Sequence, residues 1–339
     1  PGSLPPRTPQ RIPRGRAGLP VSAKGWVIHM LKVKRKRLGH RVGRRRVLLW
    51  GKSLVRAVFL LGVGFVMLYP VLFMLSSAYK SVQDTLDPTV VWIPSSLQLY
   101  NFKMAFSLMN YSTALTNTMC ILLPSVVLQV ISSLFIAYGF ARFRFRGRNL
   151  LFGLLIFNII VPTQSYMIPL YVHLQQMHLL NTVWQFYIQA ALGTGIRSGL
   201  YIFILRQFFR NMPKELEEAA CIDACGPLKT FLRVMVPNVV PALLTITVFS
   251  VVWYYNDYTL SGMLLNDNFP LSVTLTGVST SLNNQLQNMA GQVNGADVKL
   301  LSDSILSAAC LIVVLPLIGM YVVVQRFFTE GVERTGIVG

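Results

Sequence analysis

The sequence is poor in charged residues, and acidic residues are its scarcest charged class. Only 13% of its 339 residues are charged, with 12 Asp and Glu against 31 Lys and Arg, whereas 53% are hydrophobic. This balance excludes a pair of ordinary soluble domains and predicts a polytopic membrane protein. The long apolar runs contain no Asp or Glu between their flanking charges. That absence disfavours one candidate function, an ion-coupled secondary carrier, because such carriers need buried ligands for the coupling ion.

Cysteine and histidine are also scarce, with four of each. Cys120 and Cys310 fall in apolar runs, and Cys221 and Cys225 share one polar segment, so no pair lies where an oxidising compartment would form a disulfide. Cys221 and Cys225 are spaced i, i+4 and could in principle hold a metal, but no His accompanies them. We therefore predict no metal site, no cofactor and no catalytic residues. A membrane-embedded enzyme is disfavoured, whereas a membrane scaffold that does not transport stays open.

Basic residues are concentrated near the N-terminus, where 16 of the 31 precede Ala57. We predict that residues 1–56 form a disordered or basic cytoplasmic extension that lies against anionic lipid headgroups. Binding of nucleic acid is the alternative function for this basic extension. A permease domain is predicted for residues 57–328, and a cytoplasmic tail for residues 329–339.

Six apolar runs are each long enough to cross a bilayer. The segments between them alternate in charge: 27 of the 31 basic residues fall in segments assigned to the cytoplasm and 3 in segments assigned outside. The remaining one, Arg197, falls inside a run. This asymmetry predicts an all-α fold with both termini cytoplasmic. The predicted spans are residues 57–79, 117–140, 150–171, 183–209, 239–256 and 304–325.

Polar residues inside the predicted spans are candidates for a translocation path. Asn158, Pro162 and Gln164 interrupt the third span, which predicts a helix that lines a cavity or, alternatively, a kinked helix packed against its neighbours. Arg197 lies in the fourth span, where a charge costs on the order of 3 kcal/mol unless it faces water or a partner. We see no carboxylate at its depth, so we expect it to face the translocation cavity or a partner subunit.

The fifth span ends in aromatic residues from Trp253 to Tyr258, with Asn256 among them. We interpret these aromatic residues as an interfacial belt, in preference to a platform on which a substrate stacks. Asn256 is the fourth candidate for the translocation path, beside Asn158, Gln164 and Arg197.

A polar segment, residues 206–241, separates the fourth and fifth spans. Pro213 can open a helix whose first turn carries Glu215, Glu217 and Glu218. We expect Gly226, which tolerates the left-handed conformation, to end this helix before Pro227 starts a second one. The predicted product is a helix-turn-helix on the cytoplasmic membrane surface.

Leu216, Ala219 and Ala220 share one face of the first predicted helix at spacings of i, i+3 and i+4. Such a flat apolar face suits insertion into a cleft of another protein. Alternatively, the alanines pack against the ends of this protein's own helices. Glu218 also has an alternative role, because Lys214 at i−4 could pair with it on the surface.

These residues carry a resemblance to a known family. Glu218-Ala219-Ala220-Cys221-Ile222-Asp223, followed by Arg233 and Val236-Pro237, resembles the EAA loop of ABC importer permeases. In that family the loop inserts into a groove of a cytoplasmic ATPase subunit and transmits its closure to the membrane domain. The family glycine after Ile-Asp is Ala224 here, which predicts that the turn is displaced toward Gly226. The resemblance assigns ATPase coupling to Glu218, Ala219, Ala220, Asp223, Ala224, Gly226, Arg233 and Pro237.

Signatures outside this loop are similar to those of the carbohydrate-uptake subgroup of the maltose-permease G type. They include the ARFRFRG sequence at residues 141–147, WYYNDY at 253–258 and QRFF at 325–328. The resemblance implies a type I ABC importer permease with six transmembrane helices in a bacterial-type inner membrane. It further implies alternating access to a sugar or oligosaccharide. The implied partners are two ABC ATPase subunits, which hydrolyse ATP, a second permease subunit and an extracytoplasmic solute-binding protein.

Overall fold

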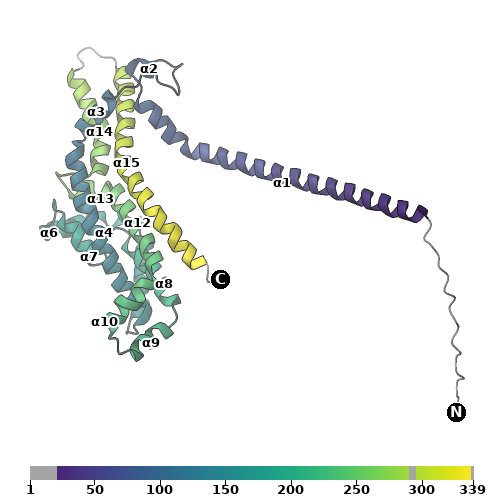
Figure 1. The fold of residues 1–339 in the computed structure, drawn as a ribbon. Helices are drawn as coiled ribbons and strands as arrows, with labels where there is room; N and C mark the ends of the chain where they lie inside the picture. Colours follow the sequence, from purple (N-terminus) through teal and green to yellow (C-terminus); the bar gives the residue numbers. More distant parts are fainter. Residues whose placement is uncertain (1–20, 290–294, 337–339) are drawn as a thin grey trace. The chain divides into compact units, whose positions relative to one another are not determined.

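The computed structural model describes residues 21–289 and 295–336, and all regular elements within these ranges are helices (Figure 1). The described chain divides into two compact units at Pro70 and Val71. Helix α1, Val21–Ala78, begins inside the predicted extension of residues 1–56. Residues 1–20 of that predicted disordered or basic extension lie outside the described residues. The first predicted span coincides with the apolar part of α1, Trp50–Ala78.

Three described helices are each long and apolar enough to cross a membrane. They are Trp50–Ala78, α4 (Tyr111–Arg142), and the section Asp303–Val322 of α15 (Gly295–Gly336). A bent pair, Pro227–Asn238 and α12 (Val240–Asn256), makes a fourth if it is counted as one span, with an angle of 78° at its bend. These segments match the predicted first, second, sixth and fifth spans.

The predicted third and fourth spans are not continuous helices. The third divides into α5 (Arg148–Ile160), a 3-10 turn at Thr163–Ser165 and α6 (Met167–Gln176). Pro162 explains this break, because proline has no N–H to donate and keeps Val161 extended, at ψ 123°. The fourth divides into α7 (Trp184–Ala191) and α8 (Ser198–Asn211). Gly193 and Arg197 lie between them with positive φ, which a continuous right-handed helix does not allow.

The segments that we predicted to be extracytoplasmic contain further helices. They are α2 (Val82–Leu86), α3 (Tyr100–Leu108), α13 (Thr259–Leu264) and α14 (Leu271–Met289). Helix α14 lies beside α15 in the second unit (Figure 1), and its Leu271, Val278 and Leu282 are buried in the same core as Ile305 and Ala309 of α15. The segment after the fifth predicted span therefore contains a packed helix.

Lys80 and Asp84 organise the loop that follows α1. The Lys80 ammonium donates to the backbone carbonyls of Val90 and Val91, at 2.7 and 3.0 Å. The Asp84 carboxylate accepts the backbone N–H groups of Ser81 and Ser95, at 3.3 and 3.2 Å. Both charged side chains therefore serve to fold the loop.

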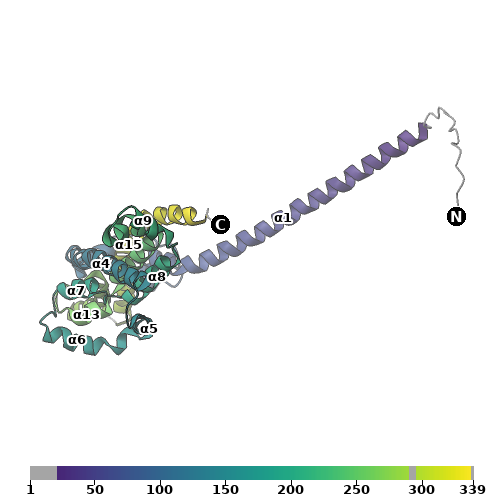
Figure 2. The same ribbon diagram turned by 90° about the horizontal axis from the view of Figure 1, so that it is seen from below.

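A second buried core lies between α4, α8, α12 and the polar segment. Figure 1 shows the short helices α9 (Glu215–Ile222) and α10 (Pro227–Thr230) at one end of this unit, away from α3. Seen from below, α5 and α6 lie on the side of the unit away from α9 (Figure 2). The core connects this end to the long helices. Its buried members include Tyr138, Tyr201, Leu205, Phe209, Phe231, Met235 and Ile246.

Candidate coupling surface and central cavity

Helix α9 forms where the acidic residues predicted a helix start. It runs from Glu215 to Ile222, with Glu215, Glu217 and Glu218 in its first turn, and Pro213 precedes it. Carboxylates at this end are stabilised by the unpaired N–H groups and the positive end of the helix dipole. The prediction of an acidic helix followed by a turn and a second short helix is confirmed.

The turn after α9 is not displaced to Gly226, so that expectation is wrong. Ala224 takes the left-handed conformation, with φ 55°, while Gly226 is extended, with φ −66° and ψ 162°. The Ala224 N–H donates to the Cys221 carbonyl at 3.0 Å, and the Cys225 N–H donates to the Ala220 carbonyl at 2.9 Å. This pair of hydrogen bonds is a Schellman motif. The turn therefore keeps its register, at a strain of about 1–2 kcal/mol in a residue with a Cβ.

Two neighbouring alanines of α9 have different environments. Ala220 is buried against the protein's own core, whereas Ala219 and Glu218 are exposed. The exposed apolar surface continues through Ile222, at 86% exposure, and Leu228 of α10, at 62%. We call Glu218, Ala219, Ile222 and Leu228 the coupling surface. The alternative that both alanines pack internally is thus wrong for Ala219. The other residues assigned to coupling, Asp223, Ala224, Gly226, Arg233 and Pro237, are exposed as well.

Glu217 anchors α9 to the rest of the protein. Its Oε1 lies 3.3 Å from Nε of Arg142, the last residue of α4, and accepts the Tyr138 hydroxyl at 3.0 Å. Arg142 also donates to the Met212 carbonyl, and its side chain is 8% exposed. This is the single ion pair among the described residues, so the pairing considered for Glu218 is absent there. Sequence reasoning placed Glu217 in the first turn but missed its anchoring role, although its i, i+3 spacing to buried Ala220 places both on the inner face.

The chain changes direction sharply between the coupling surface and α12. Phe231–Met235 forms a π-helical turn, and its Phe231 ring packs on Tyr138 and Phe135 with centroids 4.8 and 5.0 Å away. The bend of 78° follows at Val239, which is buried. Aromatic packing holds the chain before the bend, and the buried side chains of Ala242 and Ile246 hold α12 after it, so α10 and α12 are joined through a packed corner.

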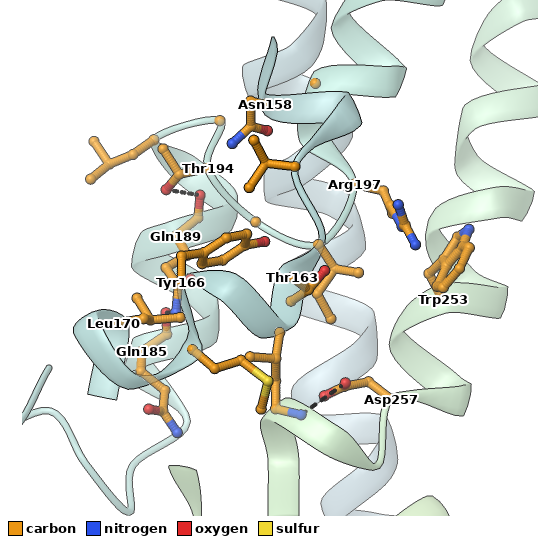
Figure 3. Close-up of a pocket in the computed structure, with 18 of the residues that line it drawn as sticks. Asn158, Thr163, Tyr166, Leu170, Gln185, Gln189, Thr194, Arg197, Trp253 and Asp257 are labelled. Carbon is orange, nitrogen blue, oxygen red and sulfur yellow. Dashed lines mark hydrogen bonds between the residues drawn. The ribbon is translucent and has the colours of Figure 1, made fainter. Parts of the chain in front are cut away.

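A cavity of about 770 Å³ lies on the other side of the broken helices, between α5, α6, α7, α8, α12 and α13. All four candidates for the translocation path line it: Asn158, Gln164, Arg197 and Asn256. Figure 3 labels Asn158 and Arg197 among the lining residues. The breaks create this arrangement. They turn polar side chains of two discontinuous stretches toward a common space, as irregular backbone at membrane depth requires.

Arg197 lies at the rim of the break, immediately before α8. It has φ 57°, and its guanidinium carbon lies 4.4 Å from the centroid of the Trp253 ring (Figure 3). The expectation that no carboxylate shares its surroundings is wrong, because Asp257 lines the same cavity. Asp257 and Arg197 form no ion pair. The Asp257 carboxylate instead accepts the backbone N–H groups of Leu260 and Ser261, at 3.1 and 2.9 Å.

The aromatic residues at the end of α12 separate into two groups. Trp253 and Tyr258 are exposed in the cavity, as a substrate-facing platform would be. Tyr254 and Tyr255 are buried, and their hydroxyls donate to Oε1 of Gln129 at 3.2 Å and to the Val313 carbonyl at 2.6 Å. The interpretation of all these aromatics as an interfacial belt is therefore wrong for the two buried tyrosines.

Gln129 is a buried residue beside the cavity loop that sequence reasoning missed. It is fully buried in α4, and its side-chain amide contacts the Ser198 hydroxyl and the Tyr254 hydroxyl. A Cβ on Gly195 would overlap Oε1 of Gln129. This network therefore fixes the loop before α8, and with it the position of Arg197. The sole sequence signal is an amide in an apolar run.

No cluster of metal-ligating side chains occurs in the described part of the chain. The four cysteines are free, with Cys221 exposed beside the coupling surface.

Comparisons with known proteins agree with this architecture. The family described as "Binding-protein-dependent transport system inner membrane component" matches residues 129–334. The chain is 26% identical to the polygalacturonan/rhamnogalacturonan transport system permease protein YtcP of Bacillus subtilis (strain 168), over 80% of this chain and 93% of the relative. It is 29% identical to the melibiose/raffinose/stachyose import permease protein MelC of the same organism, over 75% of this chain and 86% of the relative.

A solved structure shares the fold. It is a bacterial ABC transporter involved in import of the acidic polysaccharide alginate, at a TM-score of 0.67 and 24% identity, covering 81% of this chain and 96% of that chain. Because the family match covers more than half of the residues, this chain belongs to the family of binding-protein-dependent transport system inner membrane components.

Proposed function

We propose that this chain is the permease subunit of an ATP-driven ABC importer that moves a sugar or oligosaccharide into the cytoplasm by alternating access. Curated relatives are named as permeases for polygalacturonan and rhamnogalacturonan and for melibiose, raffinose and stachyose, which supports this substrate class. In this proposal two ATPase subunits hydrolyse ATP, a second permease subunit completes the pathway, and an extracytoplasmic binding protein delivers the sugar.

One observation carries the coupling role. Glu218, Ala219 and Ile222 are exposed on a helix whose opposite face is fixed to α4 through Glu217 and Arg142. An exposed apolar surface with a carboxylate beside it is suited to a partner protein, because large apolar side chains gain free energy when a partner covers them. The internal anchor lets force applied to this surface reach the long helices. Asp223, Arg233 and Pro237 are exposed nearby and complete the proposed contact.

The four polar residues of the cavity are the proposed substrate path. Asn158, Gln164 and Asn256 offer amide donors and acceptors of the kind that hydroxyl groups need, and Trp253 offers an aromatic face. A sugar combines these two requirements, because its ring has apolar C–H faces and polar edges.

Charge reversal at Glu218 tests the coupling role. The complete transporter with Glu218→Lys, reconstituted in liposomes, should lose sugar uptake and should no longer retain its ATPase subunits during purification. The matched control is Asp267→Lys, which makes the same charge change at an exposed extracytoplasmic residue and should retain the ATPase subunits. Normal uptake and normal ATPase retention with Glu218→Lys would refute the role of this surface.

A further inference from the structure

We propose that the cavity binds an anionic group of its saccharide, a carboxylate such as that of a uronic acid, on the guanidinium of Arg197. This inference rests on the proposed sugar-import function and narrows its substrate class. The observations that carry it are the charges of the cavity, the contact between Arg197 and Trp253, and the backbone conformation of Arg197.

The charges that line the cavity leave Arg197 without an acidic partner. Apart from two tyrosines, the titratable lining residues are Arg197, His173 and Asp257. Asp257 already accepts the N–H groups of Leu260 and Ser261 and, at 2.8 Å, the Ser261 hydroxyl. Its charge is therefore committed to the start of α13. Arg197 forms no ion pair within the described part of the chain. A cation in a cavity at membrane depth is costly without a counter-ion, and an anionic ligand would supply one.

The contact with Trp253 holds the guanidinium in an orientation that a carboxylate can use. The guanidinium carbon lies 4.4 Å from the ring centroid, within the range of a cation–π contact. A guanidinium over a ring keeps N–H groups at its edge, and these match the two oxygens of a carboxylate. Trp253 is 42% exposed, so part of its ring can also take the C–H face of a sugar.

The backbone at Arg197 indicates that the side chain has a specific use. Residues with a Cβ rarely take positive φ, and glycine would fit here without strain. The flanking loop contains Gly193, Gly195 and Gly199, yet the position with φ 57° is arginine. Strained positions of this kind cluster at binding sites. Gly199 also lets α5 approach closely, because a Cβ there would lie 3.3 Å from Oδ1 of Asn158, which brings a second polar group toward the start of α8.

Binding of two matched saccharides to the purified transporter, without its binding protein, tests this inference. The probes are trigalacturonate and its fully methyl-esterified form, which has the same ring structure but no charge. The native transporter should bind trigalacturonate at least about tenfold more tightly, the ratio expected for a charge-assisted hydrogen bond to arginine. Added salt should reduce the difference.

Three variants make the test specific. Arg197→Asn removes the charge with a residue that tolerates positive φ, and it should bind both saccharides equally. Arg197→Lys should keep part of the preference. Arg210→Gln removes an exposed cation of α8 outside the cavity and should keep all of it. Retention of ATPase subunits shows that each variant is folded.

Each outcome decides the inference. Equal binding of the two saccharides by the native transporter overturns it, as does an unchanged preference in Arg197→Asn or binding of neither probe. If the ester is bound as tightly and imported as fast as the acid, the proposed sugar-import function is retained and the inference of an anionic substrate is refuted. The coupling role is judged independently by ATPase retention in Glu218→Lys.

Discussion

Replacing Ala224 by glycine is expected to stabilise the turn that ends α9. Ala224 has φ 55°, and the left-handed region costs a residue with a Cβ about 1–2 kcal/mol. Glycine removes that strain but gains freedom in the opened state, which offsets about 0.4–1 kcal/mol. The net stabilisation of the closed turn is therefore about 0.5–1 kcal/mol. At 25 °C this corresponds to a two- to fivefold lower population of the opened turn.

Amide hydrogen exchange measures this local opening. The amides of residue 224 and Cys225, which form the two hydrogen bonds of the turn, should exchange two- to fivefold more slowly in Ala224→Gly. Gly226→Ala is the matched control. Gly226 has φ −66°, and a Cβ there meets no atom within 4 Å, so the alanine should not accelerate exchange. Faster exchange in Ala224→Gly, or strong destabilisation by Gly226→Ala, would show that residue 226 is the left-handed residue of the turn.

Three further changes test other parts of the structure. Glu217→Gln should destabilise the folded protein by about 2 kcal/mol, since it leaves the mostly buried Arg142 without its carboxylate; a thermal melt in detergent checks this, with no change expected for the surface variant Glu218→Gln. Gly195→Ala should impair sugar uptake because its Cβ would displace Gln129, whereas Gly153→Ala, with open space around it, should not. Hydrogen bonding by Ser95, opposed in part by burial and aided by Ser81, lowers the pKa of the Asp84 carboxyl below 3.8. The loop after α1 should thus be fully stabilised above pH 3.8 and should open more often as pH falls through the lower pKa of the folded state. A rate of protease cleavage in this loop that is unchanged between about pH 5 and about pH 2.5 would contradict this.

Hydropathy and charge asymmetry predicted the membrane character of the chain and the sections of α1, α4, α12 and α15 that cross or can cross. They did not predict that the third and fourth runs are broken, because hydropathy measures composition and not continuity. The causes of the breaks were nevertheless visible as Pro162 and as the glycines around residues 193–199. Polar residues in apolar runs were the better guide, since all four that we singled out line one cavity.

Other features could not be predicted because they depend on tertiary contacts or on local geometry. Arg142 and Glu217 are far apart in sequence, and their pairing requires α4 and α9 to be packed together. The left-handed residue was predicted at Gly226 because glycine is the usual residue there. In the structure its position is set by where α9 ends, so it falls on Ala224. The proximity of Asp257 to Arg197 was overlooked because Arg197 lies in the fourth predicted span and Asp257 directly follows the fifth, and only the packed structure shows that they line one cavity.

The length of helix α12 determines how movements at its two ends are related in time. It is 17 uninterrupted residues long, about 25 Å, and it joins the corner at Val239 to Trp253 and Asn256 at its other end. Because an uninterrupted helix moves as a rigid body, a rotation at one end of α12 displaces its other end at the same time. In the proposed importer, nucleotide-driven movement of the corner at Val239 and reorientation of the Trp253 ring would then occur together. No intermediate in which the corner has moved and the ring has not should accumulate.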